Sequence, residues 1–116
     1  MVTKGACPVL EILRKYFNYS QFHPLQEQII TDVLQKRDVL VLMPTGGGKS
    51  LCYQMPAIMS EGMAIVISPL ISLMKDQVDR LNARGIPAVS INSAMNYSLT
   101  HEVKANVMQN KVKILY

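Results

Sequence analysis

The chain has 116 residues, a net charge of +4 and 49% hydrophobic residues, with 17% charged. This length fits one domain or a part of one, and the composition is that of a folded core, which excludes an intrinsically disordered protein. The mild basic excess suits nucleic-acid or nucleotide partners, but the basic residues are scattered and form no charged arm.

The apolar runs, the N-terminus and the cysteines of the chain exclude several classes of protein. No apolar run approaches the length of a transmembrane helix, and the N-terminus lacks the pattern of a signal peptide. Cys7 and Cys52 match neither a disulfide framework nor a zinc motif. We therefore expect no membrane association, a small buried thiol at Cys52, and a cytoplasmic protein, or a nuclear one if the source is eukaryotic, with the cytoplasm preferred.

The first part of the chain predicts two helices and a strand. Pro8 can open a helix that runs to about residue 17, and turn formers occupy residues 18–24. Pro24 can then begin a second, amphipathic helix. Residues 39–43 (VLVLM) form a short run of Val, Leu and Met that is typical of a fully buried strand.

A glycine-rich loop follows this strand at residues 43–50 (MPTGGGKS) and leads into a helix predicted over residues 49–59. Its last three positions fit the phosphate-binding pattern G-x-x-x-x-G-K-[S/T], whereas Met43 stands at the first glycine position. A turn here can point successive N–H groups at an anion, next to a helix N-terminus. In this reading Lys49 bridges the terminal phosphates of ATP and the Ser50 hydroxyl coordinates Mg²⁺. The predicted nucleotide-binding loop residues are Thr45, Gly46, Gly47, Gly48, Lys49 and Ser50.

The second part of the chain alternates strands and helices. Strands are predicted at residues 63–68, 86–91 and 112–116, and helices at 69–85 and 97–110. The first of these helices is predicted to bury Leu70, Leu73, Met74 and Leu81 and to end at Gly85. Such alternation indicates βαβ units, and therefore an α/β fold with a parallel sheet between two layers of helices, a three-layer αβα arrangement.

Three segments resemble motifs of the RecQ-type DNA helicases of superfamily 2. Residues 43–50 resemble motif I of that family, which accepts a non-glycine residue at its first position, and residues 66–78 (VISPLISLMKDQV) resemble motif Ia. Residues 17–30 (FNYSQFHPLQEQII) resemble motif 0. The resemblance implies that residues 1–116 are the N-terminal part of a RecA-like P-loop domain, the first motor domain of an ATP-dependent 3′–5′ DNA helicase.

The resemblance also assigns roles to motif 0. In the family this motif holds the adenine base, so that Tyr19 would stack on the base and Gln26 would read its edge by hydrogen bonds. Two positions depart from the family, which usually has Gly at Asn18 and Arg at His23. His23 can still stack on the base, but it is mostly neutral at pH 7, so nucleotide affinity is expected to be modestly lower.

In the helicases of this family, motif Ia lies on the side of the domain that faces DNA. Ser68 stands at the end of a predicted strand and before a helix, whose free N–H groups can accept a DNA phosphate, and Lys75 is the nearest positive charge. Asn92 and Ser93 follow the next strand and are candidates of the same kind. The implied partners are ATP or ADP and single-stranded or partly duplex DNA.

An acidic partner for Mg²⁺ is not evident in the chain. None of the predicted strands ends in Asp or Glu, and the last strand stops at Tyr116, where the family carries its D-E-x-H box shortly beyond. We therefore expect a fragment that binds ATP weakly, provided it folds, and does not hydrolyse it. A non-catalytic nucleotide-binding module, a P-loop phosphotransferase and an RNA-directed superfamily 2 motor remain the alternatives.

Overall fold

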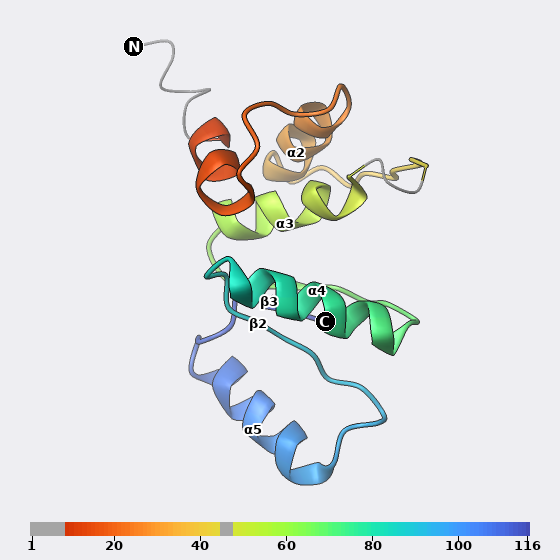
Figure 1. The fold of residues 1–116 in the computed structure, drawn as a ribbon, viewed down its shortest axis with the longest axis vertical. Coiled ribbons are helices and arrows are strands. Elements are labelled where there is room, and N and C mark those ends of the chain that lie inside the picture. The colour runs from red at the N-terminus through yellow and green to blue at the C-terminus, as the bar shows by residue number, and fades with distance from the viewer. Residues whose placement is uncertain (1–8, 45–47) are drawn as a thin grey trace. The chain divides into compact units, whose positions relative to one another are not determined.

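A computed structural model describes residues 9–44 and 48–116 (Figure 1). The chain divides into two compact units, Met1–Ser60 and Glu61–Tyr116. The predicted helix start at Pro8, the thiol of Cys7, and Thr45, Gly46 and Gly47 of the phosphate loop lie outside the described residues.

The residues of the first unit that the structure describes form three helical segments. Helical residues begin at Val9 and continue into η1 (Leu13–Phe17), a π-helical stretch. They are followed by α2 (Gln26–Leu34) and α3 (Lys49–Met59). The predicted helix that ends near residue 17 is confirmed for the part that the structure describes, and the predicted helix over residues 49–59 is confirmed. The second helix begins at Gln26 rather than at Pro24, because residues 23–26 form a turn in which Gln26 N donates to His23 O.

A shared hydrophobic core holds these helices together. Leu13 of η1, Ile30 of α2 and Met55 of α3 are each almost completely buried, and α2 packs along α3 (Figure 1). Burying each such side chain stabilises the fold by about 1.5–3 kcal/mol. This core fixes the start of α3, and hence Gly48 and Lys49, against the start of α2.

The strand predicted at residues 39–43 is wrong for this structure. The segment has no regular secondary structure, and the side chains of Leu40 and Leu42 are 87% and 86% exposed. It runs as an open connection between α2 and α3 (Figure 1). A strand requires a neighbour to pair its N–H and C=O groups, and no described residue of the first unit belongs to a strand.

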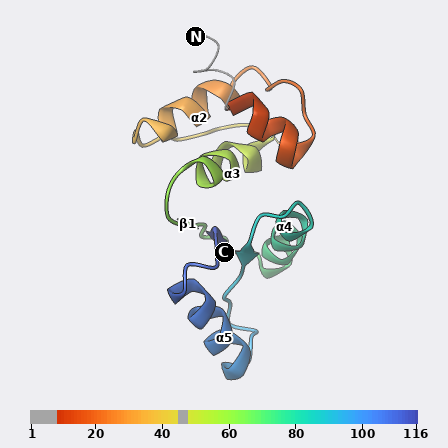
Figure 2. The same ribbon diagram turned by 90° about the vertical axis from the view of Figure 1, so that its left-hand side faces the viewer.

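The second unit is an α/β arrangement with a parallel sheet, as predicted. Its elements are β1 (Ala64–Ile65), α4 (Ile71–Ala83), β2 (Ala88–Val89), α5 (Tyr97–Met108) and β3 (Ile114–Leu115). The strand order is β1-β3-β2, and both pairings are parallel. Figure 2 shows α4 to the right of the strands and α5 beneath them.

Strand β3 is the centre of this sheet. Ile114 stands opposite Ala64 on one side and opposite Ala88 on the other, and its side chain is fully buried. Backbone bonds extend the pairing beyond the short strands: Val66 N donates to Leu115 O at 2.8 Å, and Tyr116 N donates to Val89 O at 2.9 Å. The predicted strand at residues 112–116 is therefore confirmed in its central part.

Helix α4 meets the sheet along a narrow seam. Met74 and Leu81 are buried, seven residues apart and so on one helix face, and α4 packs against β2. Leu70 and Leu73, which were predicted to share this buried stripe, are 57% and 46% exposed. Leu73 is one residue, or about 100°, away from Met74 around the helix, so it lies beside the seam. That part of the prediction is wrong.

The end of α4 is secured by a side-chain clasp. Asn82 Nδ2 donates to Ala88 O, and Ala88 N donates to Asn82 Oδ1, both at 3.0 Å. Gly85 follows the helix with φ of +82°, a conformation that favours glycine, which agrees with its predicted role as the helix terminator. The clasp joins the helix end to the strand that follows it.

Candidate nucleotide site and nucleic-acid contacts

The start of α3 has the features of an anion site. Gly48 is the N-cap in a left-handed conformation, with φ of 80° and ψ of 33°, and Lys49 is exposed in the first turn. The first turn carries no acidic side chain that would compete with an anion. The free N–H groups and the partial positive charge of a helix N-terminus favour a phosphate at this point.

Gln26 connects the motif 0 segment to the phosphate loop. Its Nε2 donates to Gly48 O at 3.1 Å, and His23 N donates to its Oε1 at 2.8 Å. The side chain is buried, with 3% of the residue exposed. One amide therefore joins two segments that are 22 positions apart in the chain. Gln26 is among the residues predicted from the sequence to bind nucleotide, but its bond to Gly48 was not predicted, since no local pattern indicates a contact over such a separation.

Glycine is favoured at position 48 by its backbone conformation and by the side chains packed around it. Its positive φ is rarely adopted by residues with a Cβ, and a Cβ placed there would overlap Gln26 Nε2. The same Cβ would lie 3.6 Å from Cδ2 of His23, so His23 also borders this point. The structure thus brings together His23, Gln26 and Gly48, three of the residues predicted to bind nucleotide, in a cradle at the start of α3.

Tyr19 is exposed, as its predicted role requires. The residue is 55% exposed, whereas Phe17 beside it in sequence is 5% exposed and belongs to the core. The preceding residue, Asn18, has φ of 58° and ends η1. Asn is one of the few non-glycine residues that adopt this conformation readily. Asn18 therefore adopts, just before Tyr19, a conformation that glycine also adopts readily.

Cys52 supports the loop from within α3. Its Sγ lies 3.8 Å from Gly48 O, the carbonyl that also accepts from Gln26. Burial raises the pKa of the Cys52 thiol above its ordinary value, so the group stays protonated at neutral pH. This agrees with the predicted role as a small buried side chain.

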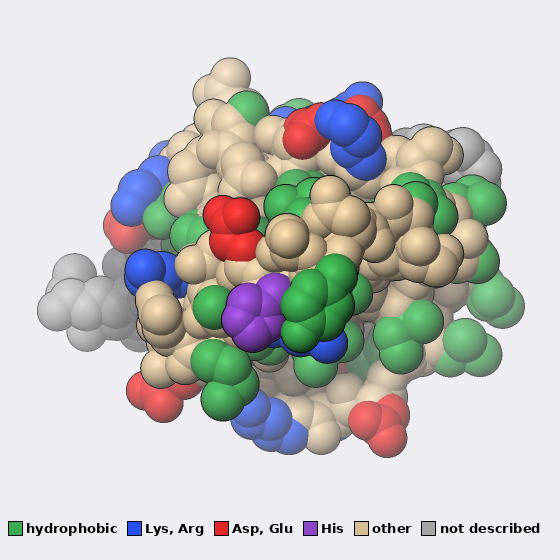
Figure 3. All heavy atoms as spheres, turned by 90° about the horizontal axis from the view of Figure 1, so that it is seen from below, with side chains coloured by type: hydrophobic (Ala, Val, Ile, Leu, Met, Phe, Trp, Pro, Cys, Tyr) green, Lys and Arg blue, Asp and Glu red, His purple; other side chains and the backbone are tan. Residues whose placement is uncertain are grey.

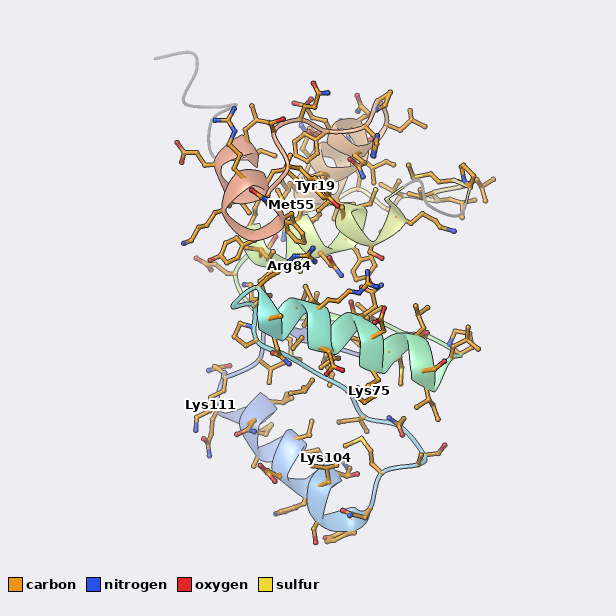
Figure 4. All side chains as sticks on the ribbon, in the orientation of Figure 1. Tyr19, Met55, Lys75, Arg84, Lys104 and Lys111 are labelled. Carbon is orange, nitrogen blue, oxygen red and sulfur yellow. The ribbon has the colours of Figure 1, made fainter. Side chains whose placement is uncertain are left out.

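The predicted DNA contacts Ser68 and Lys75 lie in the second unit and have local partners. Ser68 Oγ accepts from Leu70 N at 3.3 Å, just before α4. Lys75 Nζ lies 2.7 Å from Asp79 Oδ2, one turn further along α4 (Figure 4). Hydrogen bonding to Asp79 raises the pKa of Lys75, which therefore stays charged. A phosphate at Lys75 would compete with Asp79.

Asn92 and Ser93 follow β2. Asn92 Oδ1 accepts from Ala94 N at 2.9 Å, and Ser93 is exposed. Because parallel strands carry their carboxyl ends to one edge of a sheet, the segments after β1 and β2, which hold Ser68 and Asn92, leave the sheet in the same direction.

The described residues contain neither a cluster of metal ligands nor a helix that could span a membrane. Among residues 9–44 and 48–116, no three side chains of His, Cys, Asp or Glu gather in a way that could hold a metal ion. The helices in these same ranges are all too short or too polar to span a bilayer.

Comparison with known proteins identifies the family. The DEAD/DEAH box helicase family matches residues 23–116. The chain belongs to this family. Its α/β fold is accordingly the RecA-like helicase fold, as predicted, and the matched region includes the cradle at Gly48.

The chain is also similar to proteins named ATP-dependent DNA helicase RecQ, which confirms the resemblance found in the sequence. It is 49% identical to that of Pasteurella multocida over 107 residues, which are 92% of the chain and 17% of the relative. It is 47% identical to that of Bacillus subtilis over 106 residues, 90% of the chain and 18% of the relative. For Synechocystis sp. the identity is 41%, over 91% of the chain and 22% of the relative. The chain thus spans about a fifth of these relatives.

Proposed function

We propose that the full-length form of this protein is an ATP-dependent DNA helicase of the RecQ type, acting in the 3′–5′ direction in the cytoplasm. Residues 1–116 would form the N-terminal part of its first motor domain, with motif 0 at 17–30, motif I at 43–50 and motif Ia at 66–78. The observation that carries the proposal is the bond from Gln26 to Gly48, because it links the segment proposed to bind the base to the start of the helix proposed to hold the phosphates.

The phosphates of ATP would be held at the start of α3. The backbone N–H groups of residues 45–48 would surround them, and Lys49, exposed in the first turn, would reach the terminal phosphates. Ser50 would contribute its hydroxyl to Mg²⁺, and the other ligands of the ion would come from the nucleotide, from water and from other segments of the protein. ATP supplies the transferable phosphoryl group, whereas these residues bind it and neutralise its charge.

The base would be held by motif 0. Tyr19 would stack on one face of adenine, and the exposed His23 would border it close to Gly48. Gln26 already uses both ends of its amide, one at His23 N and one at Gly48 O. An adenine edge that offers a donor and an acceptor would exchange with these bonds. In this way the arrival of the base would change the hydrogen bonding of the loop that grips the phosphates.

DNA would contact the second unit. The candidates are Ser68 and Lys75 of motif Ia and Asn92 and Ser93 after β2. Hydroxyl, amide and ammonium groups of this kind contact phosphate oxygens rather than base edges. They would hold a strand in register without reading its sequence.

The decisive experiment measures phosphate release by the full-length protein, with and without single-stranded DNA. Lys49→Ala should abolish turnover, because it removes the cation at the terminal phosphates. Lys15→Ala, which removes an exposed lysine of η1, should leave turnover unchanged. Unchanged turnover in Lys49→Ala would refute the phosphate-loop assignment.

Two alternatives give different results in the same assay. A nucleotide-binding module without catalysis would bind ATP but release no phosphate, even in its full-length form. An RNA-directed motor would be stimulated by single-stranded RNA more than by DNA. Adenine recognition is tested separately. Tyr19→Ala and Gln26→Ala should each weaken the binding of ATP more than the binding of GTP. An equal loss of affinity for the two nucleotides would reject the base-reading role.

A further inference from the structure

Helix α5 exposes a stripe of large side chains that the nucleotide site does not use. Tyr97, His101, Lys104 and Met108 follow one another at spacings of four, three and four residues, which places them on one helix face. We refer to these four residues as the Tyr97 stripe. Tyr97 is 84% exposed and Met108 is 83% exposed, whereas Val103, on another face of the helix, is buried.

The two rings of the stripe are stacked. Their centroids are 6.0 Å apart and their planes differ by 15°, a parallel arrangement within the usual range of aromatic pairs. A hydrophobic side chain lies beside a histidine at the surface in the space-filling view (Figure 3). Since Tyr97 remains largely exposed, the contact with His101 orients the ring but buries little of it. The outer part of its π-face is left available for a further planar group.

The first turn of α5 is held in place by a cap. Asn96 is the N-cap, and its Oδ1 accepts from Leu99 N at 2.8 Å. Such a cap contributes about 1 kcal/mol to helix stability. Tyr97, the first residue of the helix, therefore projects from an ordered turn. Asn96 lies in the same connection after β2 as Asn92 and Ser93, which are proposed to contact DNA.

The charge of the stripe is positive. Lys104 is exposed within it, and Lys111 is exposed just beyond the end of α5 (Figure 4). The acidic residue of α5, Glu102, is one position after His101 and so lies about 100° away around the helix. A stacked aromatic pair and an unopposed lysine on the same face complement a planar base and its phosphate.

We propose that the Tyr97 stripe binds unpaired bases of single-stranded DNA, with Tyr97 stacking on a base and Lys104 neutralising a neighbouring phosphate. DNA as the ligand rests on the proposed function. Aromatic platforms with nearby cations are the usual means of holding single strands without reading their sequence. A protein partner is less well matched, because the centres of protein interfaces are depleted of lysine, whereas Lys104 lies in the middle of this stripe.

The test uses the full-length protein and a single-stranded oligodeoxynucleotide that contains 2-aminopurine, whose fluorescence falls when the base stacks. Tyr97→Ala should weaken binding about fivefold, the lower end of what one stacked base contributes, and should reduce the quenching. Tyr97→Phe keeps the ring and should retain both. Because Tyr97 is exposed, neither change should alter the melting temperature, which serves as the control for folding.

The lysine is tested by the salt dependence of the same binding. Lys104→Gln should lower the slope of log affinity against log salt by about 0.7, the value for one phosphate contact on a single strand. Lys15→Gln removes the same charge from an exposed site in the first unit and should leave the slope unchanged. An equal change for both variants would show a diffuse charge effect and would overturn the role of Lys104.

The outcomes separate this inference from the proposed function. If the wild type binds DNA and hydrolyses ATP, but Tyr97→Ala binds and quenches like the wild type, the inference is wrong and the helicase assignment stands. If the wild type neither binds single-stranded DNA nor responds to it, the proposed function fails. A stronger effect of Tyr97→Ala on RNA than on DNA, or on the capture of a protein partner alone, would also reject single-stranded DNA as the ligand.

Discussion

Two short apolar segments of this chain adopt different structures. Residues 39–43 (VLVLM) were predicted to form a fully buried strand, and residues 112–116 (VKILY) were predicted to form a strand. The second contains the central strand of a parallel sheet, in which Ile114 is fully buried. The first forms no strand, and Leu40 and Leu42 are among the most exposed apolar side chains described.

The difference shows that composition alone does not make a strand. Strand β3 has a partner strand on each side, so its N–H and C=O groups are paired. Because these backbone groups are satisfied, the strand can be buried together with its apolar side chains. The segment at 39–43 has equal or greater hydrophobicity but no strand partner among the described residues of the first unit. An unpaired strand would leave backbone groups unsatisfied if it were buried, so the segment stays open.

The largest expected effect tests this comparison directly. Ile114→Ala should lower the free energy of unfolding by about 2–5 kcal/mol, because it leaves a cavity at the centre of the sheet. Leu40→Ala should change it by less than about 0.5 kcal/mol, as expected for an exposed site. Urea denaturation of both variants measures the two values.

A large loss for Leu40→Ala would contradict the comparison, since it would show that the segment is buried in the folded protein. An intermediate control is Ala88→Gly, which removes one methyl group from a buried position opposite Ile114. Its cost should lie between those of the other two variants.

The second prediction compares two glycines with nearly the same backbone conformation, at φ of +80° for Gly48 and +82° for Gly85. Gly85→Ala should cost about 1–2 kcal/mol, because only the left-handed backbone is strained and the space around it is open. Gly48→Ala should cost about 2–3 kcal/mol, because its Cβ also displaces Gln26 and breaks a hydrogen bond.

Nucleotide binding separates the two glycines further. Gly48→Ala should weaken ATP binding, measured by calorimetry with the full-length protein, while Gly85→Ala should not. Equal ATP affinity in the two variants would show that the position of Gln26 does not matter to the loop.

The third prediction compares two side-chain amides that bond to the backbone of another segment, Gln26 in the first unit and Asn82 in the second. Asn82→Ala should lower the free energy of unfolding by about 1–2 kcal/mol, since it removes two hydrogen bonds to Ala88, and should leave nucleotide affinity unchanged. Gln26→Ala should reduce nucleotide affinity as well as stability. If Asn82→Ala weakened ATP binding as strongly as Gln26→Ala does, the two amides would not have separate roles.

The smallest effect is expected at the exposed pair of Lys75 and Asp79. The pKa of Lys75 is raised by this carboxylate, so the pairing is complete below the ordinary lysine value of 10.5 and is lost as the pH rises through the raised pKa. Asp79→Asn should return the pKa of Lys75 towards 10.5, with no change in stability at neutral pH. NMR titration of the Lys75 side chain measures this pKa in both proteins. The same pKa in Asp79→Asn as in the wild type would reject the pairing.

The sequence predicted well those features that depend on neighbours along the chain. The helix of residues 49–59, the terminating role of Gly85 and the order of strands and helices after residue 60 all follow from local preferences and periodicity. The exposure of Tyr19 and the burial of Cys52 were also predicted, since turn formers surround the first and an amphipathic helix contains the second.

What the sequence by itself determined is the local chemistry: a glycine loop placed before a helix, an aromatic-rich segment before it, and alternating strands and helices after it. Only the tertiary structure decided which of these segments meet. It paired β3 on both sides while leaving residues 39–43 open, and it joined Gln26 to Gly48. The physical reason is that a helix satisfies its hydrogen bonds within its own segment, whereas a strand and a buried amide need partners that are distant in the chain.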